Sequence, residues 1–394
     1  MTETRVRFLD LQAQYAGLRR EIRTAVDAVF ESQAFVLGPA VATFEAALGR
    51  YLDTAHVIGV ASGTDALYLA LRAADIGPGD AVLTTPYSFV ASATQIARTG
   101  ARPYFGDIDP ESFNLDPASV RRWLAEACRW DGAVVRAPGG EIVRAILPVH
   151  LFGRPCAIGE LGALAAEYGL VIIEDAAQAI GARIDGSGRC AGTVGRFGCF
   201  SFYPTKNLGG AGDGGCVVTS AESDAAAVRS LARHGVGGGP YRHVALGLAS
   251  RLDALQAVVL GVKLGRIEAW NAARRHHAER YEYLLTAALG AARVVAVPAL
   301  VAGHVFHQYV VRVRERDRVQ AVLTAAGIET HVYYPIPLHL QPCFAGLGHR
   351  AGDLPEAERA SAETLALPIY PELSDAAATR VVEALARALD ERGA

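Results

Sequence analysis

The sequence predicts an α/β fold: a large domain built on a mostly parallel sheet that helices cover on both faces, followed by a smaller α/β domain. Two observations support this prediction. Over the first two-thirds of the 394 residues, short and almost continuously apolar segments alternate with helix-like segments, which is typical of parallel strands buried on both faces. From about residue 252, a long helical pattern replaces this alternation. We therefore expect a large domain with an N-terminal arm over residues 1–262 and a small domain over residues 263–394.

The large domain is expected to contain strands joined by helices through right-handed connections. Helices are expected in GTDALYLALRAADIG, after the first strand, and in ASATQIARTG, after the second. Residues 121–145 become charged and glycine-containing in their second half, which we interpret as a surface excursion before a strand around Ile146. The expected strands lie in the segments HVIGVAS, AVLTT, ARPYF, RAILPVH, LVIIED, CFSFYP and GGCVVTS.

The C-terminal part is expected to begin with one long helix or two helices in tandem, in the segment LDALQAVVLGVKLGRIEAWNAARRHHAERYEYLL. A strand in HQYVVRVRE, a helix in DRVQAVLTAAGI and a terminal helix over about residues 375–392 follow. This order indicates a small α/β unit.

Composition and charge narrow the classes of partner. The chain is 51% hydrophobic and 20% charged, with a formal net charge of −3 and a pI of about 6.4, so neither nucleic acid nor a membrane is expected as a partner. The N-terminus is charged throughout, and no apolar run reaches the roughly 18–20 residues that cross a bilayer. The six cysteines show neither CxxC pairs nor metal-ligand spacing, which predicts reduced thiols in a cytoplasmic protein without a metal site.

The segment SGTDAL places a helix N-terminus directly after a strand. Ser62 can cap the helix, Asp65 follows three residues later, and Gly63 lies in the first turn. Free backbone N–H groups at such a position bind anions, and glycine lets a phosphate approach closely. The alternative is a helix cap without a ligand.

Two carboxylates, Glu174 and Asp175, end the strand LVIIED and precede small residues. Carboxylates at the carboxyl end of a parallel strand usually face a ligand crevice, and a buried aspartate needs a cation or hydrogen-bond donors. A protonated pyridine nitrogen is one suitable partner. The alternative is that the aspartate caps a helix.

Lysine is rare in this chain: Lys206 and Lys263 stand among 38 basic residues that are otherwise arginine. A lysine amine forms a Schiff base with a carbonyl, which arginine cannot do. Lys206 follows the expected strand CFSFYP, and the Ser201 hydroxyl within that strand could bind a phosphate. The alternative is a solvated surface lysine. Lys263 lies inside the long helical pattern, and we interpret it as a surface or helix–helix residue.

The glycines after Lys206 match GxGxxG at residues 210, 212 and 215. A dinucleotide-binding motif of this form follows a strand and opens a helix, whereas this one precedes the strand GGCVVTS. We therefore interpret the glycines as a place of close backbone packing rather than as the fingerprint of a dehydrogenase.

Taken together, the motifs SGTDAL, PYSFVASA, EDAAQAIGA, SFYPTKNLGG, SRLDALQA and VYYPIPLHLQP resemble the sugar aminotransferases of the DegT/DnrJ/EryC1/StrS family. The resemblance extends from about residue 7 to about residue 372. It implies the fold of type I pyridoxal-phosphate enzymes, pyridoxal 5'-phosphate as cofactor, and a homodimer with active sites at its interface. L-glutamate would donate an amino group, pyridoxamine phosphate would carry it, and a nucleotide-linked keto-sugar would accept it.

The resemblance also implies a role for Lys206 and Asp175. Lys206 would hold the cofactor as a Schiff base and then move the proton of the 1,3-shift. Asp175 would pair with the pyridine N–H and keep it protonated, so that the ring acts as an electron sink.

The other implied cofactor contacts surround these two residues. Gln178 would hydrogen-bond the 3-oxygen of the ring, and Phe89 would stack on the ring face. The backbone amides of Gly63 and Thr64, together with the hydroxyls of Thr64 and Ser201, would hold the phosphate.

Within the family, the resemblance is greatest to enzymes that aminate C3 of a UDP-linked 3-keto-sugar uronic acid, here a 2-acetamido-3-keto-uronate. It implies that Arg251 reaches the sugar carboxylate from the neighbouring subunit, for which a bidentate guanidinium is well suited; a structural salt bridge is the alternative. The family usually has asparagine two residues before this arginine, where it reaches the partner's cofactor phosphate, and Ala249 stands there. That phosphate contact is therefore in doubt.

Other activities remain open at this point. Aminotransferases that act on TDP-linked 3-keto-deoxysugars or 4-keto-sugars share much of the pattern. A sugar dehydratase of the same fold would have histidine in place of Lys206, and a non-catalytic or regulatory homologue would keep the fold alone.

Overall fold

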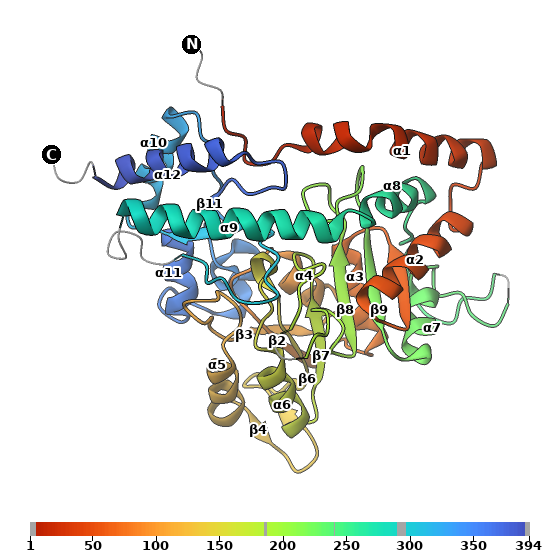
Figure 1. Ribbon diagram of the computed structural model, residues 1–394. Coiled ribbons are helices and arrows are strands. Elements are labelled where there is room, and N and C mark those ends of the chain that lie inside the picture. The colour runs from red at the N-terminus through yellow and green to blue at the C-terminus, as the bar shows by residue number, and fades with distance from the viewer. Residues whose placement is uncertain (1–4, 185–186, 240, 290–296, 391–394) are drawn as a thin grey trace.

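The structure is a computed structural model that describes residues 5–184, 187–239, 241–289 and 297–390. Its centre is a large mixed sheet, and a separate pair of strands lies in the C-terminal part (Figure 1). The strands of the large sheet are β1 (His56–Val60), β2 (Asp80–Thr84), β3 (Arg102–Phe105), β4 (Arg129–Trp130), β5 (Val135–Arg136), β6 (Ile142–Leu147), β7 (Val171–Asp175), β8 (Phe197–Ser201) and β9 (Gly215–Thr219).

Helices surround this sheet. The helices up to residue 231 are α1 (Leu11–Ser32), α2 (Pro39–Leu52), α3 (Gly63–Ala73), α4 (Ala91–Arg98), α5 (Pro117–Arg122), α6 (Ile158–Glu167) and α7 (Glu222–Leu231). The elements after it are α8 (Ala254–Leu264), α9 (Ile267–Leu289), β10 (Tyr309–Arg312), α10 (Arg316–Ala325), α11 (Pro355–Glu363), β11 (Thr364–Leu367) and α12 (Asp375–Asp390).

The sheet is mostly parallel, as predicted. Its strand order is β1-β9-β8-β7-β6-β2-β3. Parallel pairing joins β3, β2, β6, β7 and β8, whereas β9 is antiparallel to both β8 and β1. The expected excursion within residues 121–145 is confirmed: β4 and β5 form a small antiparallel pair at the sheet margin, with Trp130 exposed.

Both faces of the sheet are buried, which explains why its strands read as continuous apolar runs. Successive side chains of a strand point to opposite faces. In β9, Val217 packs in the cluster formed with α3 and α7, whereas Cys216 and Val218 pack in the cluster formed with α2 and α8. Helices α5 and α6 cover the same face as α2 and α8 further along the sheet.

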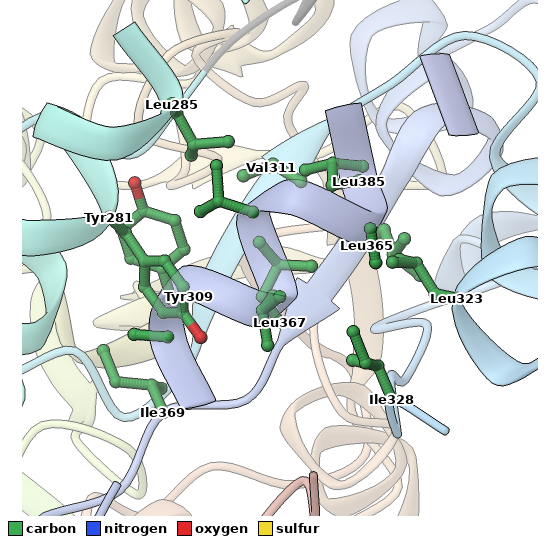
Figure 2. Packing of buried hydrophobic residues seen from close by; sticks show 14 of the residues in the cluster. Tyr281, Leu285, Tyr309, Val311, Leu323, Ile328, Leu365, Leu367, Ile369 and Leu385 are labelled. Atoms are coloured by element: carbon green, nitrogen blue, oxygen red, sulfur yellow. The ribbon is translucent and has the colours of Figure 1, made fainter. Parts of the chain in front are cut away.

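The C-terminal part has its own core. The segment from residue 252 forms two helices in tandem, α8 and α9, and α9 runs along the molecule toward α10 and α12 (Figure 1). Tyr281 of α9 packs against Tyr309 of β10, with ring centroids 4.9 Å apart, and Leu367 of β11 and Leu385 of α12 close the cluster (Figure 2). The expected domain boundary, residue 262, lies within α8, and the division into two domains stays a prediction.

The structure adds elements that the sequence analysis did not locate, namely α1, α2, α5, α6, α7, α11 and β11. Among the residues that the structure describes, no helix is long and apolar enough to span a membrane.

Candidate active site

A cavity of about 480 Å³ lies at the carboxyl ends of strands β7 and β8, the edge where ligands of open α/β sheets bind. Its wall also includes the start of α3 and, from the C-terminal part, His307 and Tyr334. Seven of the eight candidate residues line this one cavity, although they span more than 140 positions of the chain: Gly63, Thr64, Phe89, Asp175, Gln178, Ser201 and Lys206.

The N-terminus of α3 opens into this cavity. The Ser62 hydroxyl caps the helix by accepting a hydrogen bond from the Asp65 amide at 3.0 Å, as predicted. A Cβ added at Gly63 would lie only 2.6 Å from the Cβ of Ser201, and one added at Gly215 would lie 2.6 Å from the Gly63 nitrogen. Gly215 therefore packs closely against the backbone at the start of α3, as expected, whereas the nearest atoms to Gly210 and Gly212 belong to the Gln256 side chain.

Asp175 ends β7 with both carboxylate oxygens in hydrogen bonds. Oδ2 accepts from the Ser92 hydroxyl at 2.8 Å, and Oδ1 accepts from the Ala177 amide at 3.1 Å. Burial raises the pKa of Asp175, while these hydrogen bonds and the charge of Lys206 oppose the rise. Turns follow β7 here instead of a helix, so the alternative that Asp175 caps a helix is wrong.

Glu174 points away from the cavity and fixes the end of the same strand. Its carboxylate accepts hydrogen bonds from the amides of Gly192, Val194 and Gly195 and from Nε2 of His150. The Cys156 amide donates to Nδ1 of His150 at 3.1 Å, so the imidazole proton resides on Nε2. Burial works to raise the pKa of Glu174, but these hydrogen bonds lower it below its usual value.

Lys206 lies in a tight turn after β8. The Lys206 amide donates to the Tyr203 carbonyl, and the Gly210 amide donates to the Phe202 carbonyl, both at 2.8 Å. Burial lowers the pKa of the Lys206 amine to about 8, although Asp175 works in the opposite direction. Within the described part of the chain the amine has no hydrogen-bond partner, and it faces the cavity. Lys206 is only partly exposed and lines the cavity, which does not fit the alternative of a solvated surface lysine.

The remaining cavity residues are held to different degrees. Gln178 accepts a hydrogen bond from the Phe152 amide at 2.6 Å and donates one to the Tyr334 hydroxyl at 3.0 Å. Phe89 keeps 55% of its surface exposed, so its ring is available to a ligand. The cofactor contacts assigned to these residues stay predictions.

Arg251 is not among the residues of this cavity. It precedes α8 and is partly exposed, and no salt bridge joins it to any residue that the structure describes. The structural salt bridge considered for it therefore has no support within one chain. The neighbouring Ser250 is buried and accepts a hydrogen bond from the Ala61 amide at 3.1 Å, while Ala249 is exposed.

The structure places Lys263 differently from the interpretation based on the sequence. It is buried in α8, only 8% exposed, and its ammonium donates a hydrogen bond of 2.7 Å to the Gly209 carbonyl. The interpretation as a surface residue is therefore wrong, and the polar end of the side chain contacts a loop rather than another helix.

Pyridoxal phosphate, the cofactor that the resemblance implies, fits the residues present. The cavity brings together a buried carboxylate, a lysine amine that has no hydrogen-bond partner among the described residues, and a helix N-terminus whose glycine admits a close approach. Within the described ranges, no group of three His, Cys, Asp or Glu side chains could hold a metal ion.

Comparisons with known proteins find relatives along nearly the whole chain. A relative from Geobacillus stearothermophilus, named a pleiotropic regulatory protein, is 46% identical over 97% of this chain and 98% of its own. A UDP-N-acetyl-3-dehydro-alpha-D-glucosamine 3-aminotransferase from Acidithiobacillus ferrooxidans is 40% identical over 98% of both chains. A dTDP-3-amino-3,4,6-trideoxy-alpha-D-glucose transaminase from Streptomyces venezuelae is 40% identical over 97% of this chain and 95% of its own.

Solved structures share the whole fold. DesV from S. venezuelae superposes with a TM-score of 0.90, at 39% identity over 98% of this chain and 99% of its own. NtdA from Bacillus subtilis, determined with bound pyridoxamine phosphate, gives a TM-score of 0.88 at 28% identity over 99% of this chain and 86% of its own. The model of the DegT/DnrJ/EryC1/StrS aminotransferase family matches residues 17–386. The chain therefore belongs to this family of pyridoxal-phosphate-dependent sugar aminotransferases.

Proposed function

We propose that this aminotransferase moves an amino group from L-glutamate to C3 of a nucleotide-linked 3-keto-sugar. The observation that carries the proposal is that the Lys206 amine and the Asp175 carboxylate share one cavity beneath a helix N-terminus. When bound there, pyridoxal phosphate supplies the electron sink for the reaction. Lys206 would bind it covalently, and Asp175 would hold its ring nitrogen.

The environment of Lys206 suits both of its proposed tasks. A pKa of about 8 leaves a substantial fraction of the amine uncharged near neutral pH. An uncharged amine can attack a carbonyl carbon and can accept a proton. A free lysine, with its ordinary pKa near 10.4, would be almost entirely protonated.

The other cavity residues would hold the cofactor in place. The amides of Gly63 and Thr64 and the hydroxyls of Thr64 and Ser201 would bind the phosphate, as helix N-termini commonly do. Phe89 would cover one face of the ring, and Gln178 would hydrogen-bond its 3-oxygen.

For the acceptor, we infer a UDP-linked 2-acetamido-3-keto-sugar. More specifically, we infer a uronate, whose C6 carboxylate Arg251 would bind. The name of the A. ferrooxidans relative supports a UDP-linked 2-acetamido sugar aminated at C3. The name of the S. venezuelae relative supports a dTDP-linked deoxysugar as the second candidate, because identity to the two is equal. Arg251 would decide between a uronate and a neutral sugar.

We further propose a homodimer. Arg251 does not line the cavity of its own chain, and it is partly exposed without a salt bridge to the described residues. A two-fold axis would give two equivalent sites, each completed by the partner's arginine. Dimers measured by light scattering would support this arrangement, and monomers that are active at nanomolar concentration would exclude it.

The test combines product analysis with site mapping. Purified protein is given glutamate and a panel of UDP- and TDP-linked 3-keto-sugars, and 2-oxoglutarate and amino-sugar are quantified. Borohydride reduction with pyridoxal phosphate should label Lys206, which peptide mapping can assign because the chain has only one other lysine. Cofactor binding without turnover of any sugar would instead favour a regulatory role, which the name of the Geobacillus relative suggests.

A further inference from the structure

The second lysine of the chain, Lys263, contacts the loop that carries the first. Its buried ammonium donates a hydrogen bond of 2.7 Å to the carbonyl of Gly209, three residues after Lys206. Among the described residues, no carboxylate lies within ion-pair distance of this ammonium. Burial lowers the pKa of Lys263, although the charge of Glu372 works in the opposite direction.

The Gly209 carbonyl belongs to a tightly closed turn. The Gly210 amide donates to the Phe202 carbonyl across the turn, and a Cβ at Gly209 would overlap the Pro204 carbonyl. Leu208 is completely buried in the core cluster beneath. Because the turn is this compact, a shift of Gly209 would be passed on to Lys206.

A second side chain of α8 holds the same loop. The Gln256 carbonyl oxygen accepts a hydrogen bond from the Ala211 amide at 2.7 Å. Gln256 and Lys263 are seven residues apart, which places them on one face of the helix. One face of α8 therefore provides an acceptor and a donor for the segment 209–211, at two points two helical turns apart.

Packing alone does not explain a lysine here. A buried ammonium loses its hydration, and Glu372 compensates for it only from beyond ion-pair distance, whereas methionine, also unbranched and flexible, would fill similar space without this cost. The feature that methionine lacks is the hydrogen bond to Gly209. The charge is thus kept at a position where it contacts the backbone of the Lys206 turn.

We propose that Lys263, assisted by Gln256, is a positioning residue that fixes the turn of Lys206 so that its amine points at the cofactor carbonyl. This inference rests on the proposed role of Lys206. Small displacements of a reacting group can cost about a hundredfold in rate, so a clamp on the turn affects the chemical step more than substrate binding.

The experiment measures how fast Lys206 reacts. Full-length apoprotein is mixed with pyridoxal phosphate, samples are reduced with borohydride at intervals, and labelled Lys206 is quantified by mass spectrometry. Lys263→Met should slow labelling about tenfold or more, and Lys263→Arg, which keeps a charged donor, should recover much of the rate. In turnover, Lys263→Met should lower kcat with KM for the sugar within about twofold.

Two further variants separate positioning from stability. Arg316→Met removes another buried cation that donates to backbone carbonyls, those of Ser361 and Thr364, far along the chain from the loop. It should lower Tm and leave Lys206 labelling unchanged. Gln256→Leu removes the hydrogen bond to the Ala211 amide and should therefore also slow the labelling of Lys206. If Lys263→Met does not fold, the labelling rates of Gln256→Leu and Lys263→Arg test the proposal.

The outcomes are distinguishable. Wild-type protein that never becomes labelled at Lys206 would overturn the proposed function and this inference together. Wild-type labelling at Lys206, with unchanged rates in Lys263→Met and Gln256→Leu, would overturn the inference alone. Slow labelling in Arg316→Met to the same extent as in Lys263→Met would also overturn it, because the effect would then be general loss of stability.

Discussion

Nε2 of His150 donates a hydrogen bond of 2.8 Å to the carboxylate of Glu174, and both side chains are completely buried. The backbone continues the connection: the His150 amide donates to the Asp175 carbonyl, and the Asp175 amide donates to the Pro148 carbonyl. Glu174, the neighbour of Asp175, is thus the centre of a buried hydrogen-bond network that fixes the end of β7. Asp175 can face the cavity because its neighbour anchors the backbone on the other side.

Glu174→Gln should destabilise the fold. The amide group would turn an N–H toward donors that now point at a carboxylate, and each buried donor left without an acceptor costs about 1–3 kcal/mol. Urea unfolding measures the loss, and Glu160→Gln on the exposed side of α6 is the control, with a change of about 0.5 kcal/mol or less.

The pH dependence of this effect has a definite sign. Because the pKa of Glu174 is lowered in the folded state, its stabilisation is fully present above the unfolded pKa of about 4.3. It is lost as pH falls through the folded pKa. The difference between wild type and Glu174→Gln should therefore shrink in acid, and a difference that grows in acid would contradict this assignment.

Ser92→Ala should weaken cofactor binding. Loss of the hydroxyl removes a hydrogen bond that lowers the pKa of Asp175, so the carboxylate would hold a protonated ring nitrogen less well. We expect the Kd for pyridoxal phosphate to rise about tenfold, and more steeply as pH falls. Ser88→Ala is the matched control, because the Ser88 hydroxyl contacts Ser92 and not Asp175. Equal effects of the two changes would count against a direct role of Ser92.

The Lys206 amine should titrate near pH 8 in the apoprotein. Acylation of Lys206 by an amine-reactive reagent, followed by mass spectrometry at a series of pH values, should rise with a midpoint of about 8. Because the folded pKa lies below the unfolded one, the protonated lysine opposes folding, and stability should increase between pH 8 and about 10.4. A midpoint above pH 10 would show an amine in free solution instead.

Gly63→Ala should disrupt the contact between α3 and β8. The added Cβ would lie 2.6 Å from the Ser201 Cβ, so Ser201 and the first amides of α3 must separate. Both are proposed phosphate ligands, and cofactor affinity should fall together with Tm. Gly261→Ala, on the exposed side of α8 with no atom within 4 Å of the new Cβ, should instead stabilise the protein by about 0.5–1 kcal/mol.

The sequence predicted those elements correctly whose local hydrophobic pattern matches their burial in the fold. Apolar runs such as LVIIED became central strands because helices cover both faces, and the residues at their carboxyl ends came together in one cavity. The N-terminal helix α1 was missed because it buries only Leu18, Ile22 and Val29, and so narrow an apolar stripe is hard to distinguish from an irregular segment.

Long-range partners could not be predicted in the same way. Ser92 and Asp175 are 83 residues apart, and Lys263 and Gly209 are 54 apart. The helical pattern around Lys263 gave its secondary structure correctly, but its burial depends on a loop that folds back over α8. A polar residue within a helix carries no local sign of which loop will cover it, so its partner becomes visible only with the fold.

The proposed role of Arg251 across a dimer interface predicts complementation between two inactive variants. Lys206→Ala lacks the reactive amine, and Arg251→Ala lacks the carboxylate contact, so each homodimer should be nearly inactive toward a uronate. In a heterodimer, the site that keeps Lys206 receives the intact arginine from the other chain. If subunits exchange freely at equal concentrations, half of the dimers are mixed and each has one active site, which gives about a quarter of wild-type activity. If Arg251 acts within its own chain, every site lacks one of the two residues, and mixing restores nothing. Repeating the assay with a neutral 3-keto-sugar separates carboxylate recognition from structure, since Arg251→Ala alone should then retain most of its turnover.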